Sequence, residues 1–372
     1  MQIRQLDPSN PRHVRQFVAF PYALYRDCAL WVPPLRGEMA RIMDRGRHPF
    51  YAHSEADFFV VENGRGEMLG RMAMLENRSF NAFRQRRAAF FGYFEVVEEL
   101  AAARALLAAG LEWARRRGLN EVIGPRGVIG IDGSVLVEGF EHRPALGVTY
   151  NFPYYDAYIR EAGFEKDADY LSGYLPGAHQ LSARIGRIAA RVRARSGFWV
   201  KQFGSRQEVR RWLPVALALH RRAMSQLHSY YPPTQAEVQL VLETVLTIAE
   251  PRLIKLIMKE AEAVGFILAY PDISAALQRM NGRLWPFGWL HALRERRRTS
   301  WVNVNGLGLL PEHRGLGGNA VLYTELADSI HAFGYEHVDV VQVAEHNVNS
   351  FADMESIGVR WYKRHRHYRR AV

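Results

Sequence analysis

The sequence has little cysteine and no long hydrophobic run. Among its 372 residues the one cysteine is Cys28, so neither an internal disulfide nor a cysteine-based zinc site is expected. No apolar segment approaches the ~20 residues that a membrane-spanning helix needs, and the N-terminus lacks the pattern of a secretory signal. A cytoplasmic protein is therefore expected.

Acidic residues are scarce relative to basic ones. Lys and Arg number 49 against 38 Asp and Glu, which gives a formal net charge of +11 at pH 7. The hydrophobic share of 48% is ordinary for a folded protein and excludes disordered and fibrous classes. The positive charge indicates an anionic partner, namely a nucleic acid, a phosphorylated cofactor or an acidic lipid surface. Charge alone does not choose among these three.

Strand and helix signals alternate, which predicts an α/β class with a mixed α+β sheet. The same order of elements occurs twice: a hairpin, a longer strand, a helix and a short strand. In the first half these elements are expected at 57–62 and 66–75 around Asn63-Gly64, then at 88–97, 101–117 and 121–124. In the second half they are expected at 253–259, 264–270, 301–310, 320–333 and 337–343.

Each half then ends with a short helix and a similar dipeptide, Gly163-Phe164 in the first half and Gly358-Val359 in the second. We interpret the repeat as an internal duplication of one domain. The predicted domains are residues 1–177 and residues 178–372, with the boundary near Pro176-Gly177.

A glycine-rich turn joins the predicted strand at 301–310 to the helix at 320–333. Such a turn directs backbone N–H groups at a phosphate, and the dipole of the following helix favours an anion there. The spacing of Gly315, Gly317 and Ala320 fits the dinucleotide fingerprint G-x-G-x-x-A. Against this interpretation, four residues separate the strand from the first glycine, and too few residues follow Ala320 to complete a dinucleotide-binding domain.

The same turn also matches the motif R-x-x-G-x-G/A, and through it the chain resembles the GNAT acyltransferases. In that family the loop binds the pyrophosphate of coenzyme A. Asn319 stands where the family has a small residue, and a segment from Asn347 to Ser350 resembles the one that lines the pantetheine arm. The resemblance implies an acyl-CoA site without a metal, formed by Leu307, Leu309, Leu310, Arg314, Gly315, Leu316, Gly317, Gly318, Asn319, Asn347 and Ser350.

A wider resemblance covers nearly the whole chain. The tracts that carry it include W-V-P-P-L-R at 31–36, G-Y-F-E at 92–95, L-V-E-G-F at 136–140 and N-F-P-Y-Y at 151–155. They look like a bacterial group of double-GNAT N-acyltransferases, similar to bacterial ceramide synthases of the GNAT type, which acylate a long-chain amine. The resemblance implies two tandem GNAT-like domains with the acyl-CoA N-acyltransferase fold.

A single cofactor site is expected, in the second half. At the corresponding place in the first half, Glu98 and Glu99 precede the helix and glycine is absent. Two carboxylates there would repel a pyrophosphate.

If the resemblance holds, a primary amine attacks the thioester of acetyl-CoA or a longer acyl-CoA directly. A lysine-like amine with a pKa of about 10.4 is less than ~0.1% unprotonated at pH 7, so a general base assists. Glu345 is the candidate base and His346 the reserve. The family's usual acid, a tyrosine, is replaced by Met354, which leaves Tyr362 or Tyr368 as a candidate acid.

The expected partners are the acyl-CoA and a small-molecule or lipid amine, without specific nucleic acid. The segment 284–290 is aromatic, and the arginine-rich segment 294–298 follows it. This pairing suits a membrane interface or a lid over an acyl chain, with core packing as the alternative. Peripheral contact with an anionic membrane is thus a further expectation. The basic stretch 184–195 is interpreted as a solvated linker helix.

Two alternatives to acyl transfer from coenzyme A stay open. One is a double-GNAT transferase that uses aminoacyl-tRNA. The other is a degenerate GNAT that binds a ligand or partner without catalysis, which Met354 and Asn319 would permit.

Overall fold

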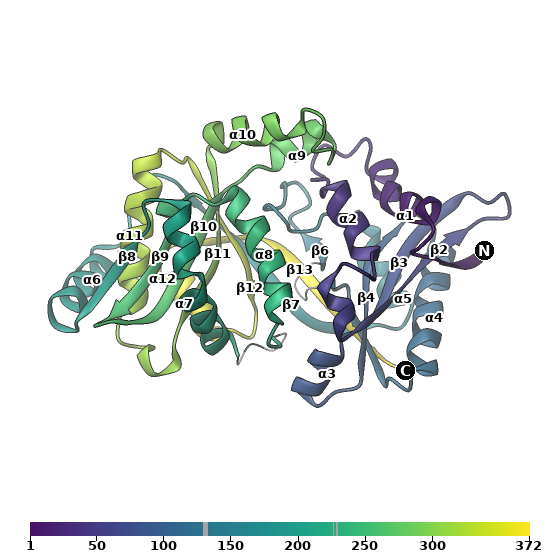
Figure 1. Cartoon of the computed structure of the whole chain (residues 1–372), viewed down its shortest axis with the longest axis horizontal. Helices are drawn as coiled ribbons and strands as arrows, with labels where there is room; N and C mark the ends of the chain where they lie inside the picture. The colour runs from purple at the N-terminus through teal and green to yellow at the C-terminus, as the bar shows by residue number, and fades with distance from the viewer. Residues whose placement is uncertain (129–132, 226, 228–229) are drawn as a thin grey trace.

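The computed structural model describes residues 1–128, 133–225, 227 and 230–372. Its main element is one mixed sheet of 13 strands that runs through both halves of the chain (Figure 1). The first half contributes β1 (Gln2–Leu6), β2 (Glu55–Glu62), β3 (Met68–Glu76), β4 (Ala88–Val96), β5 (Glu121–Gly124), β6 (Val135–Glu138) and β7 (Glu165–Pro176). The second half contributes β8 (Phe198–Gln202), β9 (Ile254–Lys259), β10 (Glu262–Pro271), β11 (Trp301–Leu309), β12 (His337–Ala344) and β13 (Arg360–Ala371).

Helices cover both faces of this sheet. Those of the first half are α1 (Pro11–Leu24), α2 (Arg36–Met43), α3 (Arg78–Arg84), α4 (Leu100–Arg116) and α5 (Tyr154–Glu161). Those of the second half are α6 (Ala183–Arg195), α7 (Arg206–Met224), α8 (Gln235–Ile248), α9 (Ser274–Met280), α10 (Gly288–Arg298), α11 (Gly318–Phe333) and α12 (Val348–Ser356).

The predicted repetition of elements is confirmed. In the first half β2, β3 and β4 are antiparallel, and β5 is parallel to β4 after the crossover helix α4. In the second half β9, β10 and β11 repeat this arrangement, and β12 is parallel to β11 after α11. The hairpin at Asn63-Gly64 differs in detail from a two-residue turn. Its loop extends to Glu67, whose N–H donates to Oδ1 of Asn63, and Gly66 takes the left-handed conformation with φ of 78°.

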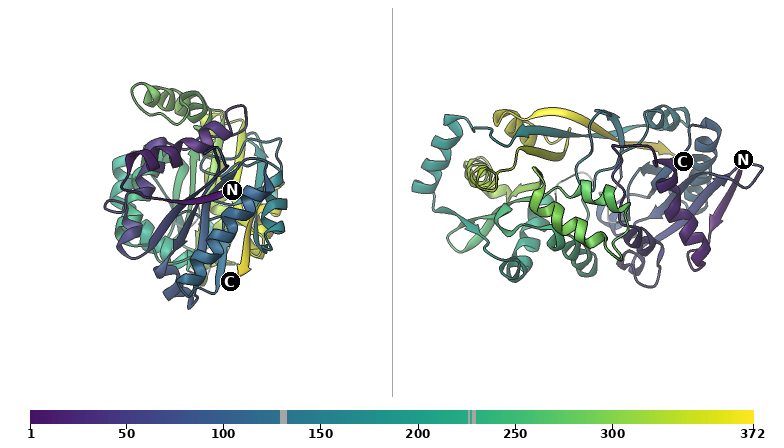
Figure 2. Two further views of the ribbon diagram at one scale, coloured as in Figure 1. Left: turned by 90° about the vertical axis from the view of Figure 1, so that its right-hand side faces the viewer. Right: turned by 90° about the horizontal axis from the view of Figure 1, so that it is seen from above.

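The last strands of the two halves are exchanged, which the sequence did not predict. β13 lies between β5 and β7, while β7 pairs with β12. Each half therefore places its own final strand beside the other half's parallel strand. Figure 2 shows β13 in yellow crossing from the second half to the first. β7 ends at Pro176, where the sequence places the domain boundary; the division into two domains stays a prediction.

The linker helix α6 is not simply solvated. Its residues Ile185, Ala189 and Val192 are buried, and the helix packs against α11. The Cβ that a substitution would add at Gly317 lies 2.8 Å from Cγ2 of Val192. The helix that joins the two halves is thus part of the surroundings of the glycine-rich turn.

The two histidines that alternate near the end of β13 are buried and bonded to carbonyl oxygens. Nε2 of His365 lies 3.0 Å from the oxygen of Thr149, and Nε2 of His367 lies 2.9 Å from that of Gly133. Within the described residues no group of three or more metal-ligating side chains is found.

Acid is expected to weaken the fold through His365. Burial lowers the pKa of His365 to about 4, whereas an unfolded chain has a histidine pKa of about 6.5. The stabilisation by the neutral ring is therefore present above the unfolded pKa and is lost as pH falls through that interval. Between pH 7 and pH 4 the free energy of unfolding should fall by about 3 kcal/mol from this group. Urea unfolding of the wild type and of His365→Gln, which keeps a donor, would measure it; parallel pH curves would contradict it.

Candidate functional site

The site begins where two neighbouring parallel strands separate. β11 and β12 pair only over Trp301–Val304 and His337–Val340. Beyond these residues both strands bulge on their outer sides: Asn305 and Gly306 oppose one residue of β10, and Val341 and Gln342 oppose one residue of β7. Gly306 has φ of 122° and Gln342 has φ of 45°. A bulge bends its strand, so the two bulges together turn β11 and β12 apart.

The separation leaves part of a strand edge unpaired inside the sheet. Among the described residues no strand pairs with the β12-facing side of β11 after Val304. Asn305 is exposed and Gly306, Leu307 and Gly308 are half-buried, whereas Asn303 earlier in the strand and Leu309 at its end are buried. An extended ligand with amide groups can add to such an edge as a further strand.

The open edge leads directly into the glycine-rich turn. After β11 a short 3-10 turn, Pro311–His313, is followed by Gly315 and Gly317, with φ of 74° and 83°. Gly317 is the N-cap of α11 and Leu316 is exposed, while Gly318 is buried in the first helical turn. Two left-handed residues in this order turn the chain sharply and place the first N–H groups of α11 at the end of the open edge.

Two side chains of the predicted phosphate loop point elsewhere. Nε of Arg314 donates to the oxygen of Leu309 at 3.1 Å, and its Nη2 donates to the oxygen of Ala223 on α7 at 3.1 Å. The amide of Asn319 donates to Oδ2 of Asp353 on α12. Arg314 thus secures the turn to β11 and α7, and Asn319 connects α11 to α12. The backbone N–H of Leu310 donates to Val264 at 2.9 Å.

The predicted residues after β12 are involved in local contacts. Oε2 of Glu345 accepts from Nζ of Lys166 at 2.6 Å, and Oε1 accepts from the N–H of Asp169 at 3.0 Å. Oδ1 of Asn347 caps α12 by accepting from the N–H of Ser350 at 3.3 Å. His346 is exposed in the turn between them. The catalytic roles of Glu345 and His346 stay predictions, and the one for Glu345 requires Lys166 to move away.

Tyr362 belongs to a buried polar cluster that the sequence analysis missed. Its hydroxyl donates to Oδ2 of Asp339 at 2.6 Å, and Nζ of Lys363 donates to the same oxygen at 2.9 Å. β13 has a bulge between Trp361 and Lys363, in which Tyr362 is the extra residue. The bulge allows the adjacent side chains of Tyr362 and Lys363 both to reach Asp339. Asp339 pairs with Asn303, one position before the strands part, so the cluster lies at the closed end of the open edge.

The electrostatics of this cluster follow from its burial. Burial raises the pKa of Asp339 and lowers that of Lys363, while each partner's charge opposes the shift. Burial and the Asp339 carboxylate raise the pKa of Tyr362 well above its usual value. The phenol therefore stays protonated, with its proton directed at Asp339. Proton transfer to a leaving thiolate would first break that bond, and the role of Tyr362 as an acid stays a prediction.

The corresponding strands of the first half also separate, but the chain itself fills the space. β4 and β5 pair only over Ala88–Phe90 and Glu121–Ile123. The N–H of Arg126 then donates to the oxygen of Phe91 at 2.7 Å, so the edge of β4 is occupied. A Cβ at Gly92 would lie 2.0 Å from the oxygen of Arg126, which explains why a residue without a side chain stands there.

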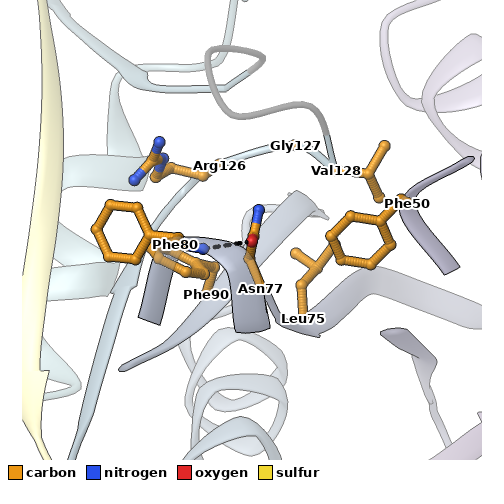
Figure 3. A pocket seen from close by; sticks show the side chains of 8 residues that line it. All are labelled: Phe50, Leu75, Asn77, Phe80, Phe90, Arg126, Gly127 and Val128. Carbon is orange, nitrogen blue, oxygen red and sulfur yellow. Dashed lines mark hydrogen bonds between the residues drawn. The ribbon is translucent and has the colours of Figure 1, made fainter. Parts of the chain in front are cut away.

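Aromatic rings close the rest of that space. The guanidinium of buried Arg126 lies 5.2 Å from the ring centroid of Phe80 and 4.9 Å from that of Phe90 (Figure 3). The cavity beside them, lined also by Phe50, Leu75 and Asn77, measures about 10 Å³. A space of this size holds at most one water molecule. The described part of the chain thus offers an open strand edge in the second half and a closed one in the first.

The chain is similar over nearly its whole length to two bacterial proteins. It is 22% identical over 376 residues to Protein YghO of Escherichia coli (strain K12), covering 98% of this chain and 94% of that protein. It is 24% identical over 374 residues to the Bacterial ceramide synthase of Caulobacter vibrioides (strain NA1000 / CB15N), covering 97% of this chain and 96% of that protein. No protein-family model matches the chain.

Solved structures share the fold from end to end. A tandem GNAT protein from the clavulanic acid biosynthesis pathway matches with a TM-score of 0.57 at 14% identity, covering 100% of this chain and 98% of that one. A GCN5-related N-acetyltransferase from Sphaerobacter thermophilus matches with a TM-score of 0.51 at 12% identity, covering 100% and 95%. The predicted tandem GNAT fold, that of acyl-CoA N-acyltransferases, is therefore confirmed for the whole chain.

Proposed function

From the tandem GNAT fold, we propose that the chain transfers an acyl group from acyl-CoA to a primary amine, at a single site in its second half. The observation that carries the proposal is the unpaired edge of β11, which runs into two left-handed glycines and the N-terminus of α11. The edge suits the two amides of a pantetheine arm, and the helix terminus suits a pyrophosphate. An amine nucleophile would attack the thioester directly where β11 and β12 part.

Basic side chains around the turn support a polyanionic ligand. Arg184 and Arg191 are exposed on α6, the helix whose Val192 and Ile188 lie against Gly317. No ion pair within the described residues involves either arginine. Arg187, also exposed, stands three residues after Arg184 and four before Arg191. Like charges at these spacings destabilise a helix slightly, and a bound phosphate would relieve this repulsion.

The acceptor is inferred to be a lipid amine. The similarity of nearly the whole chain to a protein described as a bacterial ceramide synthase supports this class. Titration calorimetry with acetyl-CoA and then palmitoyl-CoA would compare acyl lengths. Tighter binding of palmitoyl-CoA is the expected result. Failure of both to bind would contradict the proposal and favour the aminoacyl-tRNA or non-catalytic alternatives.

A carboxylate at Gly315 is expected to abolish tight binding of coenzyme A. A Cβ at Gly315 would have no contact within 4 Å, whereas a Cβ at Gly317 would meet two side chains of α6. Gly315 is therefore the better position for the substitution. Gly315→Glu and Gly315→Gln share the strain of a left-handed residue and differ only in charge. Gly315→Glu should bind roughly a hundredfold more weakly than Gly315→Gln, because its carboxylate opposes the pyrophosphate. Calorimetry measures both; equal affinities would refute the site.

A further inference from the structure

The connection between β10 and β11 carries an apolar surface that faces away from the protein. It contains α9 and α10, with α10 along the top of the molecule in Figure 1. Trp285 is 76% exposed, Phe287 69% and Leu293 50%. Together with Leu284, Trp289 and Leu290, which are also exposed, they form what we call the α10 surface. Several large apolar side chains gathered at one place mark an interaction site more often than chance exposure.

The orientation of α10 is the reverse of that of an ordinary surface helix. The less exposed residues of α10 recur at helical spacing and are Gly288, Ala292, Glu295 and Arg296. Glu295 pairs with Arg279 of α9 on that inner side. Trp289, Leu290 and Leu293 occupy the outer side, where a soluble protein normally places polar residues. The apolar side chains therefore face outward because α10 packs against the protein with its opposite side.

Hydrogen bonds to the first half of the chain fix the position of the segment that contains α9 and α10. Gln278 at the end of α9 donates to the oxygens of Ala29 and Trp31 at 2.8 and 3.0 Å. The N–H of Arg36 donates to the oxygen of Gly282 at 3.0 Å. A Cβ at Gly282 would lie 2.3 Å from the oxygen of Pro34, so the two segments are in close contact. The segment that carries the α10 surface is thus bonded to the first half of the chain, and in the view from above in Figure 2 its light-green helices lie over the middle of the molecule.

Positive charge surrounds the α10 surface. Arg283, Arg294, Arg297 and Arg298 are exposed, and no ion pair within the described residues involves them. The one carboxylate on α10, that of Glu295, is already paired with Arg279. Aromatic and aliphatic side chains beside unpaired arginines match the two layers of a bilayer surface, the acyl chains and the anionic headgroups. A second copy of this chain would bring the same positive charges together across a two-fold interface.

We infer that the α10 surface docks the protein on an anionic lipid bilayer, with Trp285 and Phe287 entering the interface and the arginines contacting phosphate headgroups. Contact is peripheral, since no helix among the described residues is long and apolar enough to cross a membrane. This inference goes beyond the proposed acyl transfer and does not depend on it.

The test is co-sedimentation of the full chain with vesicles, without acyl-CoA. The wild type should bind vesicles with about a third phosphatidylglycerol far better than pure phosphatidylcholine, and added salt should weaken the binding. The variant Arg294→Gln/Arg297→Gln/Arg298→Gln should bind roughly a hundredfold more weakly, at about fivefold per arginine. Trp285→Ser/Phe287→Ser should also lose about a hundredfold, because two large side chains no longer leave water.

Matched controls lie on another face. Arg210→Gln/Arg211→Gln/Arg221→Gln removes the same charge from α7, where all three arginines are exposed. Val215→Ser/Val241→Ser removes exposed apolar side chains from α7 and α8. Both controls should bind vesicles like the wild type. Equal binding to both vesicle types, no binding, or an equal loss in the controls would overturn the inference. So would a dimer without vesicles that Trp285→Ser/Phe287→Ser dissociates, because a second copy would then cover the surface.

Discussion

A chain that ends at Val359 is expected to lose the fold of both halves, although the deletion lies wholly within the second. β13 pairs with β5 and β6 of the first half and with β7 along most of its length. It also carries Tyr368, which is fully buried in the core of the first half, and the Lys363 side chain beside Asp339. Removing β13 leaves β6 without a partner strand, exposes one edge each of β5 and β7 and opens both cores, a loss far larger than the ~5–15 kcal/mol that stabilises an ordinary domain.

Circular dichroism and urea unfolding of the truncated chain would measure this effect, with the full chain as reference. The exchange also predicts that residues 1–180 and residues 181–372 do not fold when each is expressed alone but assemble when co-expressed. The cut after residue 180 lies in an exposed connection and spares Gly177, whose N–H donates to Glu336 at 2.7 Å. A cooperative unfolding transition in either piece alone would contradict the prediction.

The repeated order of elements was predictable because its signals are local. The helix α4 follows from an Ala- and Leu-rich stretch closed by Gly118, and the strand β5 matches its predicted bounds. The exchange of β7 and β13 was not predictable, because each strand would also satisfy the edge left in its own half. Which edge a strand takes depends on contacts between residues far apart in the chain, and these leave no periodic signal.

The candidate site likewise has a part that local sequence predicts and a part that depends on contacts between distant residues. The glycine turn is defined by residues that are neighbours in sequence, and its left-handed residues are two glycines of this run, Gly315 and Gly317. The side-chain directions of Arg314 and Asn319 depend on α7 and α12 and could not be read from the motif. One overlooked signal was present: Asp339 stands among valines in a buried strand, where a charge requires a partner.

Lys363→Met is expected to destabilise the protein by about 3–5 kcal/mol at pH 7. The Lys363 ammonium and the Asp339 carboxylate are both buried, and their atoms lie 2.9 Å apart. Methionine fills the volume of the lysine stem. The Asp339 carboxylate then keeps only the hydrogen bond that the hydroxyl of Tyr362 donates to Oδ2. Oδ1 has no hydrogen-bond partner among the described residues. A buried charge without its counter-ion retains its desolvation cost, which explains the size of the effect. Urea unfolding at pH 7 measures it.

The pH dependence and a double variant separate this cause from simple misfit of the side chain. Without Lys363 the folded-state pKa of Asp339 should rise further above its unfolded value of about 3.9. A group with a raised pKa favours the folded state while protonated, so the deficit of Lys363→Met should shrink as pH falls from 7 toward 4. Lys363→Met/Asp339→Asn removes both charges, and it should recover most of the lost stability at pH 7. A deficit that is constant with pH and unchanged in the double variant would show that packing, and not charge, holds this end of the open edge.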